Sequence, residues 1–137
     1  MLNENEIRDL LRTTKRIAVV GLSDNPSRDS YGVAGFLQRH GYEIMPVNPQ
    51  LHGPVLGAQS YATLHDVPPP IDIVDIFRRS EFVPEIVEDA IAVGARAIWM
   101  QLGVIHPEAV RRASEAGLQV VIDRCIAIEY RRLMRDG

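Results

Sequence analysis

The chain contains 137 residues, of which 46% are hydrophobic and 24% are charged, and its formal net charge at pH 7 is -3. This length suits a single domain spanning residues 1–137, and the composition is that of a folded globular protein rather than a disordered chain. The negative net charge argues against a nucleic acid partner, because nucleic acid-binding domains are usually basic.

The N-terminal residues and the cysteine content bear on cellular location. The first eight residues are mostly polar or charged, and no apolar stretch in the sequence is long enough to form a signal peptide or to cross a membrane. Cys125 is the single cysteine, which excludes a disulfide within the chain. We therefore expect a cytoplasmic protein that has no membrane partner.

Five short runs rich in β-branched residues predict strands, at residues 16–22, 43–47, 72–77, 95–100 and 119–122. Most of these runs are apolar on both faces, as in a parallel sheet that is covered by helices on both sides. Helical patterns alternate with the strands, at residues 4–12, 31–40, 81–93, 107–116 and 126–134. Ser30 and Ser80 are placed to cap two of these helices, and Pro107 stands at the first position of another.

This alternation predicts the fold class. Strands that alternate with helices indicate an α/β protein with parallel pairing and right-handed crossovers. We expect a Rossmann-like, doubly wound, mainly parallel five-stranded sheet with helices on both faces.

The first predicted strand runs directly into a turn that contains Gly21, Ser23 and Asn25. Glycine lets the backbone approach a ligand closely, and hydroxyl and amide side chains supply hydrogen-bond donors. The helix that follows directs its free N–H groups toward an anion. The pattern predicts a phosphate-binding turn.

A long segment without regular structure, residues 48–71, follows the second predicted strand and contains much of the proline. Ligands of doubly wound sheets bind at the carboxyl ends of the strands. We expect this segment to form one wall of the ligand site.

The turn does not match the common nucleotide motifs. Ser23 and Pro26 stand where the dinucleotide pattern requires glycine, and the end of the second strand, residues 47–49, has no carboxylate for a ribose. The sequence also contains no Gly-Lys-Ser or Gly-Lys-Thr of a P-loop. An NAD(P)-binding, oxidoreductase-like protein therefore stays only as an alternative.

Several motifs occur in the order of a known family. They are VVGLSDNP at 19–26, GYEIMPVNP at 41–49, LG at 56–57, Tyr61, DIVDIFRR at 72–79, WMQLG at 99–103 and DRC at 123–125. Together they resemble the small stand-alone coenzyme A-binding proteins that are related to the N-terminal domain of the succinyl-CoA synthetase alpha subunit. The resemblance covers nearly the whole chain and implies a domain that holds coenzyme A (CoA) across the carboxyl ends of its strands.

The residues fit the chemistry of CoA, which carries a pyrophosphate and a 3′-phosphate and so needs donors at two places. Gly21, Ser23 and Asn25 are candidates for the pyrophosphate. The candidates for binding either phosphate through a guanidinium group are Arg28, Arg78 and Arg79. The resemblance implies further that the adenine lies between Val47, Asn48 and Pro49 on one side and Ile76 and Phe77 on the other. It also places Gln101 and Gly103 beside the pantetheine arm.

Other notable side chains have simpler interpretations. Phe77 and Trp99 are expected in the core, because large aromatic residues dominate protein cores. Cys125 is expected to be a buried, inert thiol, although the neighbouring arginine could make it reactive toward the thiol of CoA. The arginines near the C-terminus are expected on a solvated helix face, and they are Arg131, Arg132 and Arg135.

The sequence contains no pattern that assigns a reaction. The four histidines lack metal-ligand spacing, so we expect no metal site, and no catalytic triad stands out. The larger synthetase relatives carry a phosphorylated histidine in a second domain, which has no counterpart here. We expect a CoA-binding carrier, sensor or binding subunit that does not itself catalyse a reaction. Half of a two-chain acyl-CoA ligase is a further alternative, and a protein partner or a homo-oligomer stays open.

Overall fold

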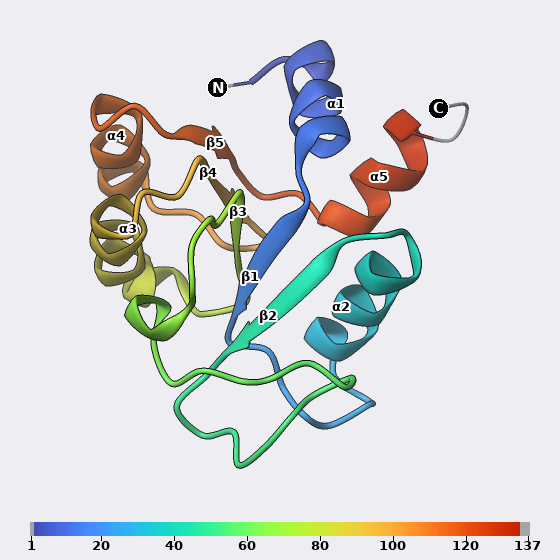
Figure 1. The fold of residues 1–137 in the computed structure, drawn as a ribbon. Helices are drawn as coiled ribbons and strands as arrows, with labels where there is room; N and C mark the ends of the chain where they lie inside the picture. Colours follow the sequence, from blue (N-terminus) through green and yellow to red (C-terminus); the bar gives the residue numbers. More distant parts are fainter. Residues whose placement is uncertain (1, 135–137) are drawn as a thin grey trace.

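Five parallel strands form the centre of the structure, which is a computed structural model that describes residues 2–134 (Figure 1). The strands are β1 (Arg16–Val20), β2 (Glu43–Val47), β3 (Ile73–Ile76), β4 (Ala97–Met100) and β5 (Gln119–Val121). Their order in the sheet is β2-β1-β3-β4-β5, and each neighbouring pair is parallel. The predicted α/β, Rossmann-like sheet is confirmed.

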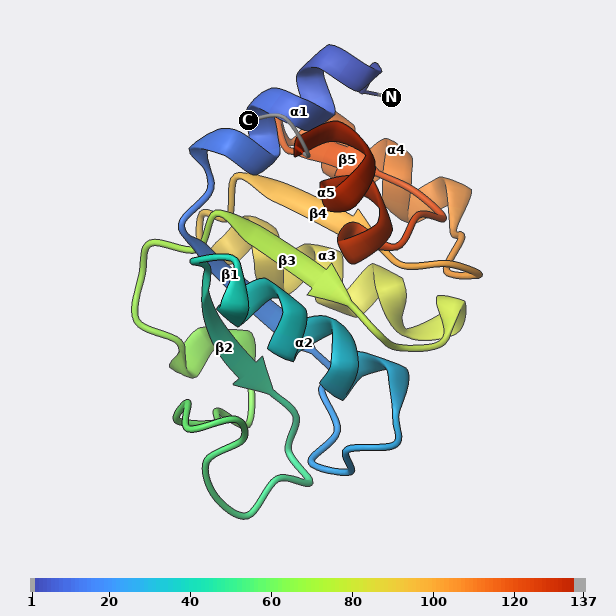
Figure 2. The same ribbon diagram turned by 90° about the vertical axis from the view of Figure 1, so that its right-hand side faces the viewer.

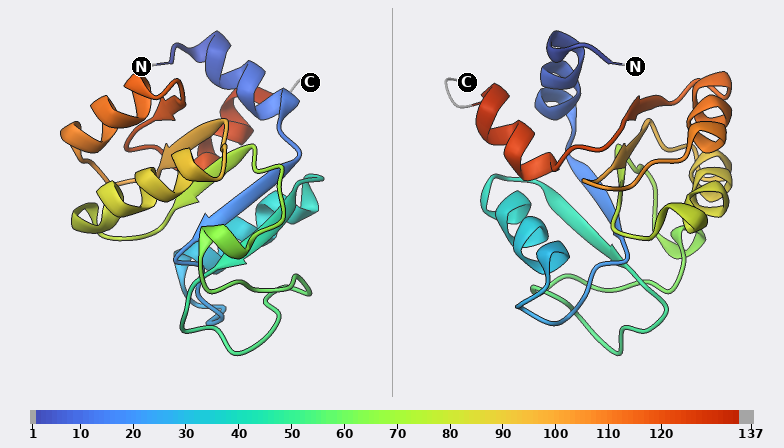
Figure 3. Two further views of the ribbon diagram at one scale, coloured as in Figure 1. Left: turned by 60° about the vertical axis from the view of Figure 1, so that its left-hand side comes forward. Right: turned by 180° about the vertical axis from the view of Figure 1, so that it is seen from behind.

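Helices cover both faces of this sheet, as predicted (Figures 2 and 3). One face packs against α1 (Glu4–Thr13), α2 (Asp29–Arg39) and α5 (Ile126–Met134). The other face packs against α3 (Val83–Ala92) and α4 (Pro107–Glu115). The chain leaves β1 toward β2 on one side and later returns to β3 on the other side, so the strand order reverses between β1 and β3. In doubly wound sheets this switch point opens a crevice at the carboxyl ends of the strands.

Trp99 anchors the core on the face covered by α1, α2 and α5. Its side chain is fully buried, and its indole Nε1 donates a hydrogen bond to the Arg124 carbonyl oxygen at 2.8 Å. The expectation that Trp99 lies in the core is confirmed.

Asp75 interrupts this apolar layer. It lies in β3, in register with Val19 of β1 and Trp99 of β4, and its exposed fraction is 0%. Within residues 2–134, neither of its carboxylate oxygens has a hydrogen-bond partner. Burial raises the pKa of this carboxyl well above its ordinary value, because the charged form is poorly solvated there. Asp75 is thus an acidic residue at a core position where no described residue would stabilise its charged form.

The two predicted serine caps are wrong. Helix α2 begins at Asp29 without a side-chain cap, and Ser30 lies inside the helix, where its Oγ accepts a hydrogen bond from the Ser23 N–H at 3.0 Å. Ser80 begins a short 3-10 turn ahead of α3, and its Oγ accepts a hydrogen bond from the Ile105 N–H at 3.0 Å. Each hydroxyl holds a neighbouring loop in place instead of a helix end.

The segment at residues 48–71 is largely irregular, as predicted. Its regular parts are a 3-10 turn at Leu64–Asp66 and two isolated bridges, one between Val47 and Tyr61 and one between Val55 and Ala58. Figure 1 shows the segment at the same end of the sheet as the loop that follows β1.

Two further findings concern the described part of the chain. None of its helices combines the length and apolar character that a membrane span requires. Within the same residues, no group of three or more histidine, cysteine or acidic side chains is arranged to hold a metal ion. Arg135, one of the predicted C-terminal arginines, lies outside the described residues.

Gly32 offers a simple test of helix α2. It lies inside this helix and is exposed, and a Cβ added there would have no heavy atom within 4 Å. We expect Gly32→Ala to raise the free energy of unfolding by about 0.5–1 kcal/mol, because alanine loses less backbone entropy in a helix. Urea denaturation measures the change, and a lower stability would contradict the conclusion that a methyl group fits at this position.

Candidate functional site

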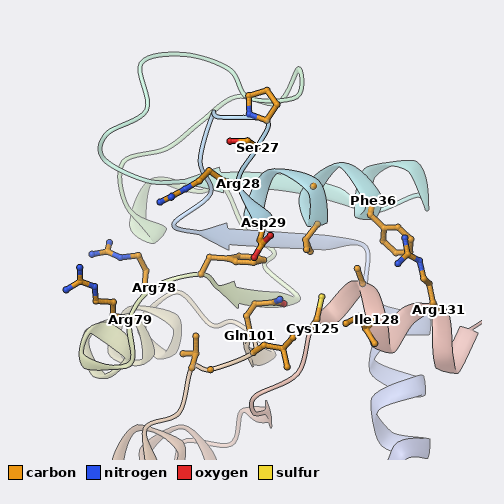
Figure 4. Close-up of a pocket in the computed structure, with 18 of the residues that line it drawn as sticks. Ser27, Arg28, Asp29, Phe36, Arg78, Arg79, Gln101, Cys125, Ile128 and Arg131 are labelled. Carbon is orange, nitrogen blue, oxygen red and sulfur yellow. The ribbon is translucent and has the colours of Figure 1, made fainter.

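A groove with a volume of about 870 Å³ opens at the carboxyl ends of the strands (Figure 4). Its walls come from the loops that follow β1, β3 and β4 and from one face each of α2 and α5. A smaller hollow of about 400 Å³ adjoins it beside the β1 turn, and the two share Ser27, Arg28, Asp29 and Phe77. We call them the main groove and the turn hollow. Their size is typical of small-molecule sites.

Gly21 brings the ends of β1 and β3 together. Its φ angle is +88°, and a Cβ at this position would clash with the carbonyl oxygen of Phe77. The Gly21 N–H donates a hydrogen bond to the Val47 carbonyl oxygen at 2.8 Å, which also ties the turn to β2. Only glycine fits this junction between three strands.

The polar side chains of the turn hold its shape. The Ser23 Oγ accepts a hydrogen bond from the Asn25 N–H at 3.0 Å, and the Asn25 Oδ1 accepts one from the Ser27 N–H at 3.0 Å. A hydroxyl that accepts a hydrogen bond keeps its own hydrogen as a donor. Ser23 lines the turn hollow and has this donor available, whereas Asn25 lines neither the turn hollow nor the main groove.

Three arginines lie at one end of the main groove (Figure 4). The Arg78 guanidinium lies 4.4 Å from the centre of the Phe82 ring, which orients it through a cation–π contact. The Arg79 Nη1 lies 3.7 Å from the Glu81 Oε1 in an exposed pair, which contributes little stability. Arg28 has no carboxylate partner within 4.0 Å among residues 2–134. This end of the groove is therefore suited to an anion.

The loop that follows β4 is fixed from two sides. Gln101 is buried, and its Oε1 accepts a hydrogen bond from the Ile126 N–H at the start of α5, at 3.1 Å. The Gly103 N–H donates a hydrogen bond to the Asp123 Oδ1 at 2.7 Å. These bonds hold the β4 loop against the loop that follows β5, and both Gln101 and Gly103 line the main groove.

The structure thus brings together eight of the thirteen predicted site residues. Those that line the main groove or the turn hollow are Gly21, Ser23, Arg28, Phe77, Arg78, Arg79, Gln101 and Gly103. Phe77 is half-buried: it packs against the core and also lines both hollows, so the expectation that it belongs to the core is met only in part.

The other predicted site residues lie outside both hollows. Val47 and Ile76 are buried in the core, and Pro49 is exposed beyond β2. The Asn48 Nδ2 donates a hydrogen bond to the Leu22 carbonyl oxygen at 3.2 Å, and so joins the β2 loop to the β1 turn. A contact of these residues with adenine stays a prediction.

Several groove residues were not among the predicted site residues. They are Pro26, Ser27, Asp29, Gly32, Val33, Phe36, Arg39, Leu102, Val104, Cys125, Ala127, Ile128 and Arg131. Cys125 is half-buried, and its sulfur points into the groove (Figure 4). Helical spacing shows that Phe36 and Arg39 share a face of α2, and that Ile128 and Arg131 share a face of α5. Only the tertiary structure shows that these two faces meet.

A parallel sheet with a ligand-sized groove at the carboxyl ends of its strands defines the Rossmann-like class of α/β proteins. Within that class, this chain belongs to the CoA binding domain family, whose sequence profile matches residues 15–131. The family predicted from the motifs is confirmed.

Relatives support this membership over nearly the full length. The chain is 42% identical over 125 residues to the Uncharacterized protein YneT of Bacillus subtilis (strain 168), and the match covers 91% of this chain and 92% of that protein. The structure of a hypothetical protein from Pyrococcus horikoshii OT3 is 41% identical and has a TM-score of 0.93. That match covers 97% of this chain and 93% of the other.

A larger protein contains a similar part. The dinucleotide forming Acetyl-coenzyme A synthetase 1 of Ca. Korarchaeum cryptofilum, in complex with phosphate and ADP, is 26% identical, with a TM-score of 0.70. The match covers 83% of this chain but only 27% of the synthetase chain. The similarity thus concerns one part of that enzyme.

Proposed function

We propose that this protein binds CoA or an acyl-CoA in the main groove and the turn hollow, as a carrier, sensor or binding subunit. The observation that carries the proposal is the group of arginines at the strand ends of a chain that belongs to the CoA binding domain family. The cytoplasmic location, a protein partner and a homo-oligomer stay predictions from the sequence.

The pyrophosphate is proposed to bind at the β1 turn. Helix α2 contains 11 residues and begins beside the turn hollow without a side-chain cap, so its first N–H groups are available to an anion. The Ser23 hydroxyl and the Arg28 guanidinium add donors on the same side. A phosphate in this position would complete the unfilled hydrogen bonds of the helix end.

The 3′-phosphate is proposed to bind Arg78, with Arg79 as a second cation. Both follow β3 directly, and Arg78 is already oriented by its contact with Phe82. The half-buried ring of Phe77 offers an apolar surface to the adenine, and the pantetheine arm would then extend toward Gln101 and Gly103.

Calorimetry with CoA, dephospho-CoA and NAD tests this proposal. We expect CoA to bind about tenfold more tightly than dephospho-CoA, because charge-assisted hydrogen bonds to the 3′-phosphate would be lost. Arg78→Gln should remove that difference, whereas Arg111→Gln, on α4 and away from the groove, should preserve it. Equal affinity for all three ligands, or none for any, would overturn the proposal. Tighter binding of NAD would favour the oxidoreductase-like alternative.

The likeness to one part of the acetyl-coenzyme A synthetase favours a second candidate, half of a two-chain acyl-CoA ligase. This candidate predicts that acyl-CoA forms only when a second chain supplies the ATP-binding part. Mixing this protein with such a chain and measuring acyl-CoA formation against each chain alone tests it. An equal rate for the second chain alone would count against the ligase.

A further inference from the structure

The main groove extends beyond the site proposed for the pantetheine arm. Past Cys125 it continues between α2 and α5, where its lining residues are Gly32, Phe36, Arg39, Ala127, Ile128 and Arg131. A Cβ added at Gly32 would have no heavy atom within 4 Å, so open space lies beside this wall. We call this part of the main groove the distal arm.

The sides of the distal arm are apolar. Phe36 and Ala127 are largely buried and form the apolar base of this wall, whereas Ile128 is 50% exposed. Leu102, which also lines the main groove, is 61% exposed. Large exposed apolar side chains around a groove suit a ligand that covers them with hydrocarbon.

The far end of the distal arm is cationic. The Arg131 guanidinium lies 4.5 Å from the centre of the Phe36 ring, so the side chain reaches from α5 to α2 across the end of the groove (Figure 4). Arg39 stands three residues after Phe36, on the same face of α2.

Arg39 and Arg131 have no carboxylate partner among residues 2–134, in contrast to the next residue along α5, Arg132. Arg132 pairs with Glu4 at 2.8 Å and with Glu129 at 2.7 Å. For Arg39 and Arg131, no carboxylate of residues 2–134 lies within 4.0 Å. The distal arm therefore presents positive charge that the described residues do not neutralise.

We infer that the distal arm takes the acyl chain of an acyl-CoA that ends in a carboxylate, and that Arg131 binds this carboxylate with Arg39 at its side. The inference rests on the proposed function, which extends the pantetheine arm of CoA toward Gln101 and Gly103. Cys125 lines the main groove beside them, because the Gln101 side chain bonds to the next residue, Ile126. Arg131 lies five positions after Ile126, the first residue of α5, which is about 7.5 Å along the helix axis. The Arg131 guanidinium lies over the Phe36 ring of α2, on the far side of the distal arm from the pantetheine site. This spacing suits a short acyl chain.

The charge distribution selects this class of acyl group over a neutral one. A hydrocarbon chain that ends in a methyl group would cover the apolar walls but would leave the guanidinium groups without an anion. A terminal carboxylate offers two oxygens that match the paired donors of a guanidinium group. The distal arm thus discriminates by the end of the acyl chain rather than by its length alone.

The test compares two acyl groups of equal length by calorimetry. Glutaryl-CoA ends in a carboxylate and pentanoyl-CoA ends in a methyl group. We expect glutaryl-CoA to bind about fivefold more tightly, as for a partly exposed ion pair, and the difference to shrink as salt is added. Arg131→Gln should abolish the preference without changing the affinity for CoA, and Arg131→Glu should reverse it. Arg131→Lys should retain part of it, and Arg111→Gln should leave it intact.

The outcomes separate this inference from the proposed function. If CoA binds and the two acyl-CoAs bind equally, the inference is overturned while the proposed function stands. If CoA itself does not bind, both fail. If Arg131→Gln weakens CoA but not dephospho-CoA, Arg131 binds the 3′-phosphate and the inference is overturned. The melting temperature of each variant confirms that it folds, which the exposed position of Arg131 leads us to expect.

Discussion

Asp75→Asn is expected to stabilise the protein by about 2–4 kcal/mol at pH 7, because a buried carboxyl without a partner is costly to ionise and asparagine is not ionised. The carboxyl is fully buried, and its two oxygens have no hydrogen-bond partner within the described chain. Asparagine has nearly the same shape, so packing against Val19 and Trp99 should be preserved. Urea denaturation at several pH values measures the difference.

The pH dependence has a definite sign. Burial raises the pKa of Asp75 well above its ordinary value of 3.8, so the folded protein holds a proton that the unfolded chain releases. The contribution of Asp75 to stability is complete below about pH 4 and decreases as pH rises, by about 1.4 kcal/mol for each pH unit, up to its folded pKa. The advantage of Asp75→Asn should therefore be small at pH 4 and should increase toward pH 7.

A matched control is Asp24→Asn, the same change at an exposed position of the β1 turn, which should leave the stability at pH 7 within about 0.5 kcal/mol of the wild type. A loss of stability in Asp75→Asn at pH 7 would mean that the carboxylate serves the fold or a ligand in its charged form. That result would contradict a neutral acid in the core between Val19 and Trp99.

Gly21→Ala is expected to lower the free energy of unfolding by about 3 kcal/mol and to abolish CoA binding, because it combines backbone strain with a steric clash. The φ angle of Gly21 is +88°, and the added Cβ would meet the Phe77 carbonyl oxygen and the Arg78 side chain. To relieve the clash, the end of β3 must move away from the end of β1. Urea denaturation and calorimetry with CoA measure the two effects.

Gly117→Ala separates the two causes. Gly117 has nearly the same φ angle, +89°, but a Cβ there would have no heavy atom within 4 Å. This variant should lose only about 1 kcal/mol, from strain alone, and should bind CoA normally. Equal losses for Gly21→Ala and Gly117→Ala would show that the contact between the β1 and β3 ends contributes nothing.

The order of the secondary structure elements could be predicted from the sequence because its signals are local. Each strand is a short β-branched run, and Gly41, Gly94 and Gly117 each end a helix with a positive φ angle, +94°, +75° and +89°. The β1 turn was recognisable for the same reason, since Gly21 and Ser23 lie close together in the chain. The family followed from motifs that are also local, and the profile match at residues 15–131 confirmed it.

What a side chain contacts could not be predicted where the partner is remote. Ser30 and Ser80 matched the capping pattern, but their hydroxyls bond to Ser23 and Ile105 instead. Phe77 is apolar enough for a core, yet its position at the end of β3 leaves it half-exposed in the groove. The partner of each of these side chains depends on which loops meet at the sheet edge. The meeting of the loops is a property of the packed structure.

The sequence by itself determined the α/β class, the alternation of strands and helices, and the glycine turn at Gly21, because these depend on residues that are neighbours in the chain. The tertiary structure alone decided that Asp75 is fully buried in the core without a hydrogen-bond partner among residues 2–134. It also decided that α2 and α5 enclose a groove that ends at Arg131. Both results arise because elements that are distant in sequence pack against one sheet. This packing sets how deeply Asp75 is buried and which charges surround Arg131, and no local sequence pattern encodes it.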